Sequence, residues 1–139
     1  MKNYFIVYKP FNVLSQFTSQ KERKTLKDFF DVTVDVYSVG RLDYNSEGLL
    51  ILINDKLLNH RLLNPALLHE REYWIQVEGK ITVEGIYALQ GEIDINIDGN
   101  VCWTKKCKAT IFNEPSVVAE RYPSCKKKYS FELDKAYHN

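Results

Sequence analysis

The sequence predicts an α+β domain, in which short helices flank a mixed, largely antiparallel sheet. Three observations favour this class. Segments that alternate apolar and polar residues, or that collect β-branched and aromatic residues, recur along the chain. Two other segments carry apolar residues at helical spacing behind recognisable caps. A length of 139 residues, of which 45% are hydrophobic and 27% charged, suits one compact domain.

Strands and one short helix are expected in the first part of the chain. Residues 4–8 are aromatic and β-branched, which favours a strand, and this strand ends before Pro10 because proline has no amide to donate to a ladder. The segments expected next are a loop with a short extended piece at 9–18, a short helix at 25–30, a strand at 34–39 and an apolar strand at 49–53.

Two helices follow, each between a start signal and a stop signal. Residues 56–64 place leucines at helical spacing, with Asp55 as the expected N-cap and Pro65 as the stop. A second helix is expected over residues 82–90, beginning at its own threonine cap and closing near Gly91. The remaining strands are expected at 72–79, 92–97, 106–112 and 128–133, with a turn at 98–100.

The charge and the cysteines limit the classes of function. A net charge of +1 and a pI near 7.7 do not indicate a nucleic-acid binder, although basic residues cluster at 21–24, 105–108 and 126–128. Such blocks are usually solvated, and phosphate binding is the alternative. The three cysteines, Cys102, Cys107 and Cys125, form no C-x-x-C pair, which indicates free thiols in a reducing compartment. With no apolar run of membrane-spanning length and no signal-like N-terminus, we expect a cytoplasmic location.

The most informative stretch is residues 40–50, a polar loop between two glycines and two strand-like runs. Its leucine, Leu42, is expected to anchor the loop to the core. In an extended segment, residues two apart share a side, so Arg41 and Asp43 are expected on one face. A nearby arginine would favour the ionised carboxylate. The alternative is a turn whose charges are only solvated.

This stretch resembles the signature G-R-L-D-x-x-S/T-x-G-L-L of pseudouridine synthases, in the branch that modifies ribosomal RNA. Every specified position from Gly40 to Leu50 matches. The resemblance implies that Asp43 is the catalytic aspartate. It also implies that Arg41 contacts the RNA backbone or fills the space left by a flipped base, and that Asn45 belongs to the RNA-binding residues.

Two further motifs carry the resemblance. Lys9-Pro10 resembles the first motif of these synthases, which implies that Lys9 binds RNA phosphates. Residues 13–18 resemble the subgroup called ribosomal large-subunit pseudouridine synthase E. Tyr73, within Arg71-Glu72-Tyr73, resembles the second motif, whose tyrosine contacts the target base and is proposed to assist proton transfer.

The resemblance implies isomerisation of a specific uridine to pseudouridine in ribosomal RNA, in the large-subunit 23S rRNA for this subgroup. The base must leave its stack to be reached. We expect ribosomal RNA as the partner, no membrane, no small-molecule cofactor, no metal and a monomer. The family continues into a basic motif like N-R-Q-V/I-R-R-M, and this sequence stops at residues 135–139. Residues 1–139 are therefore expected to be the N-terminal and central portion of the catalytic domain, without a separate N-terminal RNA-binding module.

Two alternatives remain at this point. The first alternative is a catalytically inactive RNA-binding remnant or truncated fragment of such an enzyme. The second is a hydrolase that uses Asp43 and Glu47 as a carboxylate pair. Glu47 precedes a glycine and fits a solvated loop residue better, which ranks the hydrolase last.

Overall fold

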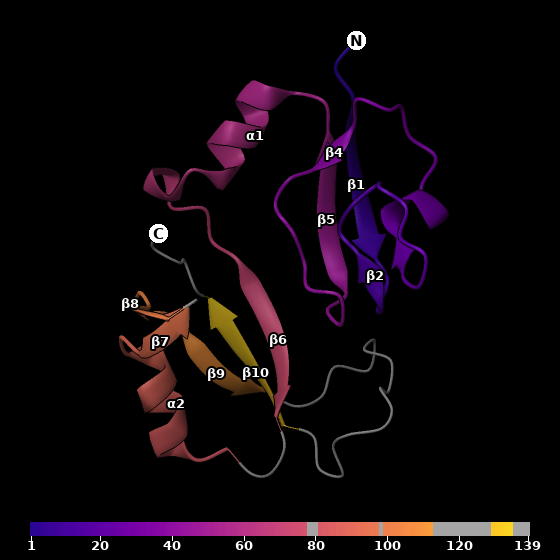
Figure 1. Cartoon of the computed structure of the whole chain (residues 1–139). Helices are drawn as coiled ribbons and strands as arrows, with labels where there is room; N and C mark the ends of the chain where they lie inside the picture. The colour runs from indigo at the N-terminus through magenta and orange to yellow at the C-terminus, as the bar shows by residue number, and fades with distance from the viewer. Residues whose placement is uncertain (78–80, 98, 113–128, 135–139) are drawn as a thin grey trace. The chain divides into compact units, whose positions relative to one another are not determined.

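The computed structural model describes residues 1–77, 81–97, 99–112 and 129–134. The chain forms two compact units, Met1–Leu67 and Leu68–Asn139 (Figure 1). Within the described residues, short helices accompany small, mostly antiparallel sheets, which confirms the predicted α+β class. Among these residues, no helix has the length and apolar character of a membrane span.

The first unit is built on a three-stranded antiparallel sheet in the order β1-β5-β4. Its strands are β1 (Tyr4–Lys9), β5 (Gly48–Ile53) and β4 (Tyr37–Ser38). The two long strands lie side by side, with Tyr4 opposite Ile53 and Lys9 opposite Gly48 (Figure 1). A short parallel pair, β2 (Val13–Leu14) with β3 (Lys24–Thr25), stands beside a 3-10 helix, Leu26–Asp28.

One face of this sheet meets the core of the first unit. The side chains buried there come from both strand pairs and from the connecting loops: Val13, Leu26, Val36, Leu50 and Leu52. On the other face, Ile6, Tyr8 and Leu49 remain exposed. From Ile6 to Tyr8 and from Leu49 to Leu52, the alternation therefore defines one buried and one more exposed face.

Helix α1 (Lys56–Leu63) follows β5 and is capped by Asp55, as predicted. The Asp55 carboxylate accepts hydrogen bonds from the backbone amides of Leu57 at 3.1 Å and Leu58 at 3.2 Å. Asn64 ends the helix, and a 3-10 turn, Pro65–Leu67, comes next.

The second unit holds β6 (Glu72–Val77), β10 (Tyr129–Asp134) and β9 (Ala109–Phe112), paired antiparallel in that order. A hairpin joins β7 (Asp94–Ile97) to β8 (Asn100–Trp103). Helix α2 (Val83–Gln90) packs Ile86 against Ala109 in β9, and Thr82 caps it as predicted. The Thr82 hydroxyl accepts from the Gly85 amide at 3.1 Å, and the Gly91 amide closes the helix on Ala88.

Three predicted elements differ from the structure. The strand expected over 34–39 is wrong in its first half, because the Val36 amide donates to the Thr33 carbonyl at 3.0 Å and forms a turn. The helix expected at 25–30 is a single 3-10 turn. The strand expected from residue 106 begins at Ala109, because the Cys107 amide donates to the Gln90 carbonyl instead of to a neighbouring strand.

One strand was missed by the sequence analysis, and several predictions concern residues outside the described ranges. The strand β8 was not predicted, since its sequence follows the expected turn directly. Parts of the predicted segments at 72–79, 98–100 and 128–133 lie outside the described residues, as do the basic block 126–128 and Cys125. Cys102 and Cys107, the described cysteines, are not in disulfides, as the sequence predicts.

Candidate active site in the turn before β5

The turn from Gly40 to Glu47 leads into β5 and carries the predicted catalytic residue. Exposure alternates along it: Arg41, Asp43 and Asn45 are exposed, while Leu42 and Tyr44 are half-buried. Leu42 packs on the core of the first unit, which confirms the predicted anchor. The Ser46 amide donates to the Asp43 carbonyl at 3.1 Å and closes the turn. The Asp43 carboxylate therefore stays at the surface.

The glycines at both ends of this turn adopt conformations that other residues disfavour. Gly40 has a φ of +71° and Gly48 a φ of +138°. A Cβ on Gly40 would meet a Leu63 methyl at 3.4 Å, whereas a Cβ on Gly48 would meet nothing within 4 Å. At Gly48 it is thus the backbone conformation, and not the available space, that requires glycine.

Arg41 and Asp43 are both exposed on this turn, with the half-buried Leu42 between them. Their charged groups form no ion pair with each other, and within the described ranges no side chain or amide binds the Asp43 carboxylate. The carboxylate is thus not used as a cap for its own backbone. It remains available to a molecule that approaches the turn from solvent.

Two buried polar side chains hold the backbone on either side of Asp43. The Ser15 hydroxyl donates to the Leu42 carbonyl at 2.8 Å and accepts from the Leu42 amide at 3.0 Å. Lys9 has 0% exposure, and its ammonium group donates to the Val13 carbonyl at 2.6 Å and reaches the Tyr44 carbonyl at 3.5 Å. The last residue of β1 and the segment after this strand thus hold the residues before and after Asp43.

The position of Lys9 differs from the sequence-based expectation. Its ammonium group also donates to the Pro10 carbonyl at 3.0 Å, so it faces carbonyls inside the unit rather than solvent. Burying a charge without such partners would be costly. The geometry gives no support to the phosphate contact predicted for Lys9, which stays a prediction.

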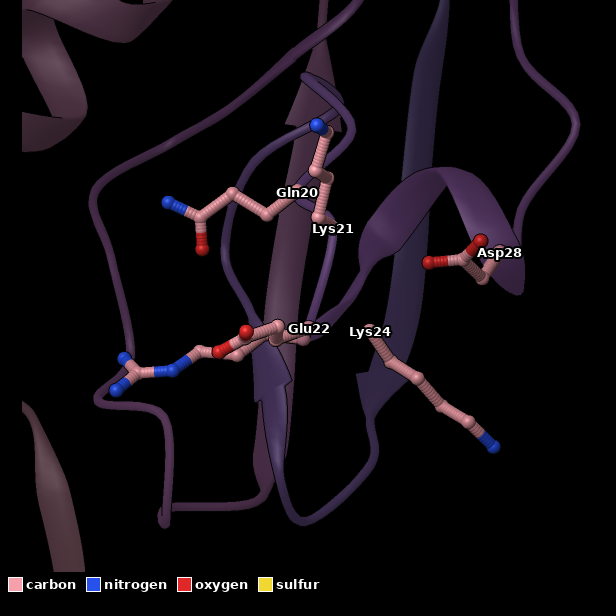
Figure 2. A pocket seen from close by; sticks show the side chains of 6 residues that line it. Gln20, Lys21, Glu22, Lys24 and Asp28 are labelled. Atoms are coloured by element: carbon pink, nitrogen blue, oxygen red, sulfur yellow. The ribbon is translucent and has the colours of Figure 1, made fainter.

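The basic block at 21–24 lies close to the same turn. The Arg23 guanidinium stands over the Tyr44 ring, 5.1 Å from its centroid, in a cation–π contact. The block lines an open hollow together with Gln20 and Asp28, and the Lys21 and Lys24 side chains extend away from each other (Figure 2). A hollow lined by polar side chains alone does not suit an apolar small molecule.

Tyr73 belongs to the second unit, on β6. Its side chain is 36% exposed, so packing does not bury it. In the ladder it stands opposite Leu133 of β10. The structure therefore brings Arg41, Asp43 and Asn45 together in one turn, with Lys9 beneath it, and leaves Tyr73 on a strand of the other unit.

Ser15 and Arg23 were not among the predicted site residues. A buried hydroxyl such as that of Ser15 needs a partner, but the partner is 27 residues away in the sequence. Arg23 belongs to a basic block that is usually solvated, and nothing local points to Tyr44. Both contacts depend on the tertiary fold.

Known proteins resemble this chain in sequence and in fold. Residues 3–136 match the family of RNA pseudouridylate synthases. The chain is 44% identical over 93 residues to a ribosomal large subunit pseudouridine synthase E from Xanthomonas axonopodis pv. citri, which covers 66% of this chain and 48% of that protein. It is 36% identical over 116 residues to a protein of the same name from Vibrio parahaemolyticus, covering 84% and 47% of the two chains.

A more distant relative and a solved structure agree with these matches. The dual-specificity RNA pseudouridine synthase RluF of Escherichia coli is 37% identical over 100 residues, which cover 72% of this chain and 33% of that one. A crystal structure of a pseudouridylate synthase matches the fold with a TM-score of 0.72 at 22% identity, over 100% of this chain and 53% of the other. This chain spans about half the length of the synthases E that it matches. The match over residues 3–136 shows that the chain belongs to the RNA pseudouridylate synthase family.

Proposed function

We propose that this chain carries the catalytic aspartate of an enzyme that isomerises a specific uridine of ribosomal RNA to pseudouridine, with the large-subunit 23S rRNA as substrate. One observation carries the proposal most directly. Asp43, at the aspartate of the family signature, is exposed, and its carboxylate has no intramolecular partner among the described residues, on a turn held on both sides. The family match and the names of the relatives support the same reaction.

In this reaction the uracil is detached from its ribose at the N-glycosidic bond, rotated and joined again through carbon. The target nucleotide first leaves its stack, which costs a few kcal/mol. Asp43 then acts either at the ribose C1′ or as a base on the sugar. Both routes need an ionised carboxylate that reaches the nucleotide, and an exposed side chain on a fixed turn meets this requirement.

The other predicted residues take supporting roles in the proposal. Arg41 and Asn45 are exposed on the same turn as Asp43 and would contact the RNA around the flipped base. Tyr73 would stack on the uracil. The basic block at 21–24 would bind phosphates beside the turn. The monomeric state, the lack of a cofactor and the cytoplasmic location stay predictions.

The proposal is tested with Asp43→Asn. Asparagine keeps the size of the side chain and removes its charge, and residue 43 is exposed, so the fold should not change. Incubation with unmodified large-subunit rRNA, made by transcription in vitro, is followed by mass spectrometry of the nucleosides. We expect pseudouridine from the wild type and a loss of at least about 100-fold in the variant.

Glu47→Gln is the matched control and separates the carboxylate-pair hydrolase from the isomerase. The isomerase requires only a small effect of this change, whereas a hydrolase that uses both carboxylates would lose its activity. Filter binding of the same RNA gives a second readout. If the Asp43→Asn variant binds the RNA as well as the wild type does, and neither protein forms product, the chain is an RNA-binding module and not an enzyme.

A further inference from the structure

The Ser15 hydroxyl forms two hydrogen bonds with Leu42, whereas one would be enough to satisfy a buried hydroxyl. One hydroxyl satisfies both the amide and the carbonyl of the same residue, at 3.0 and 2.8 Å. A neighbouring strand does the same for a residue in a ladder. Leu42 lies in a turn outside the strands, so Ser15 takes the place of the missing strand.

Ser15 is itself held firmly. It is 6% exposed, and its own carbonyl accepts a hydrogen bond from the Ser38 hydroxyl at 3.3 Å. Next to it, the Gln16 amide donates to the Leu14 carbonyl at 2.8 Å. Ser15 is therefore a fixed point from which the hydroxyl reaches the turn.

Leu42 immediately precedes Asp43, and its side chain packs on the core of the first unit. With the side chain held by packing and both backbone polar groups of Leu42 held by Ser15, the residue directly before Asp43 is fixed, including the carbonyl of the peptide that joins the two residues. Without the hydroxyl, the Leu42 amide and carbonyl lose their hydrogen-bond partner. The direction of the Asp43 side chain then varies.

We propose that Ser15 is a positioning residue, which aims the Asp43 carboxylate through the backbone of Leu42. This inference rests on the proposed function of Asp43. Ser15 is buried, with its hydroxyl engaged by Leu42, so its effect belongs to the chemical step and not to RNA binding.

The test compares Ser15→Ala with Thr25→Val in the full chain. Thr25 is also buried in the first unit, and its hydroxyl donates to Asp28 at 3.2 Å, away from the turn. Both variants lose one buried hydroxyl. Steady-state kinetics on unmodified large-subunit rRNA give kcat and KM, and hydrogen exchange measured by NMR follows the Leu42 amide.

We expect Ser15→Ala to lower kcat about 10- to 100-fold at an unchanged KM, because small misplacements of a catalytic group have effects of this size. Its Leu42 amide should exchange faster than in the wild type. Thr25→Val should change neither. An unchanged kcat in Ser15→Ala, or a loss that appears only in KM, would overturn the proposal.

Failure of the proposed function gives a different result. If the wild type forms no pseudouridine, the function of Asp43 is wrong, and the exchange of the Leu42 amide alone decides whether Ser15 holds the turn. Exchange that is the same in Ser15→Ala and in the wild type would then reject the contact as a restraint.

Discussion

At the scale of single residues, Asp55 joins the beginning of β1 to the beginning of α1. Besides capping the helix, its carboxylate pairs with the Lys2 ammonium at 2.8 Å and accepts from the Tyr4 hydroxyl at 3.0 Å. The hydrogen bond from Lys2 and that from the Leu58 amide are the main causes that lower the pKa of Asp55 from 3.8 to about 2. The charged form is thus favoured in the folded state.

This lowered pKa predicts a dependence of stability on pH. Since the pKa is lower in the folded chain than in the unfolded one, the stabilisation is complete above about pH 4 and is lost as the pH falls toward about 2. Asp55→Asn should lower the melting temperature by about 5 °C near neutral pH, and this difference should shrink in acid. Thermal melts followed by circular dichroism between pH 7 and pH 2 measure it.

Asp31→Asn is the control for this experiment, because Asp31 is exposed and outside these contacts. Its melting temperature should follow that of the wild type at every pH. A difference between Asp55→Asn and the wild type that is as large in acid as at neutral pH would contradict the assigned cause.

The residues of the site differ in how far the sequence predicts them. The exposure of Asp43 and the anchoring by Leu42 follow from alternation over neighbouring residues, which is local information. The role of Ser15 depends on a partner 27 residues away. A lysine at a strand end is ordinarily solvated, and the turn of the chain after β1 brings the Val13 and Pro10 carbonyls to Lys9, while the Tyr44 carbonyl comes from 35 residues away.

At the scale of elements, the two helices were predicted because their signals are local. Asp55 and Thr82 bind amides of the first turns that they precede, and such caps are readable in the sequence. The strand expected over 34–39 failed because β-branched residues favour a strand while the Asp35 side chain favours a turn. The Asp35 carboxylate accepts from the Asn54 amide group at 2.6 Å, a contact that the sequence does not reveal.

Helix α2 provides a prediction at this scale. Ile86 is buried against Ala109 of β9, whereas Val83 on the same helix is 60% exposed. Ile86→Ala should lower the free energy of unfolding of the second unit by about 2–4 kcal/mol, because it leaves a cavity. Val83→Ala should change it by less than about 0.5 kcal/mol.

Denaturant unfolding and the hydrogen exchange of amides in β9 measure the stability of the second unit in the two variants of α2. The first unit serves as an internal reference, and its amides should exchange at the same rate in both variants. Equal losses of stability in the two variants would show that α2 does not pack through Ile86.

At the scale of the whole molecule, the net charge of +1 conceals an uneven distribution. One basic block, residues 21–24, contacts the turn of the first unit through Arg23 and Tyr44. The block at 105–108 belongs to the second unit. If RNA reaches Asp43, phosphates on either side of the target nucleotide should meet the first block.

Salt dependence measures this contact. Replacement of Lys21, Arg23 and Lys24 by glutamine should weaken binding to large-subunit rRNA and reduce the slope of log affinity against log salt by about 2, at about 0.7 per phosphate contact. The matched control replaces Lys105, Lys106 and Lys108 and should change the slope less. A slope that falls equally in both would mean that RNA contacts are spread over both units.

The alternating exposure from Arg41 to Asn45 has a consequence for how this segment tolerates changes of length. Insertion or deletion of one residue ahead of Leu42 would exchange the exposed and the half-buried positions. Leu42 and Tyr44 would then turn outward, and Asp43 would turn inward. Such an insertion would also move the peptide groups away from the Ser15 hydroxyl. The packing of Leu42 and its contact with Ser15 therefore fix the number of residues in this segment, whichever side chains its outward positions carry.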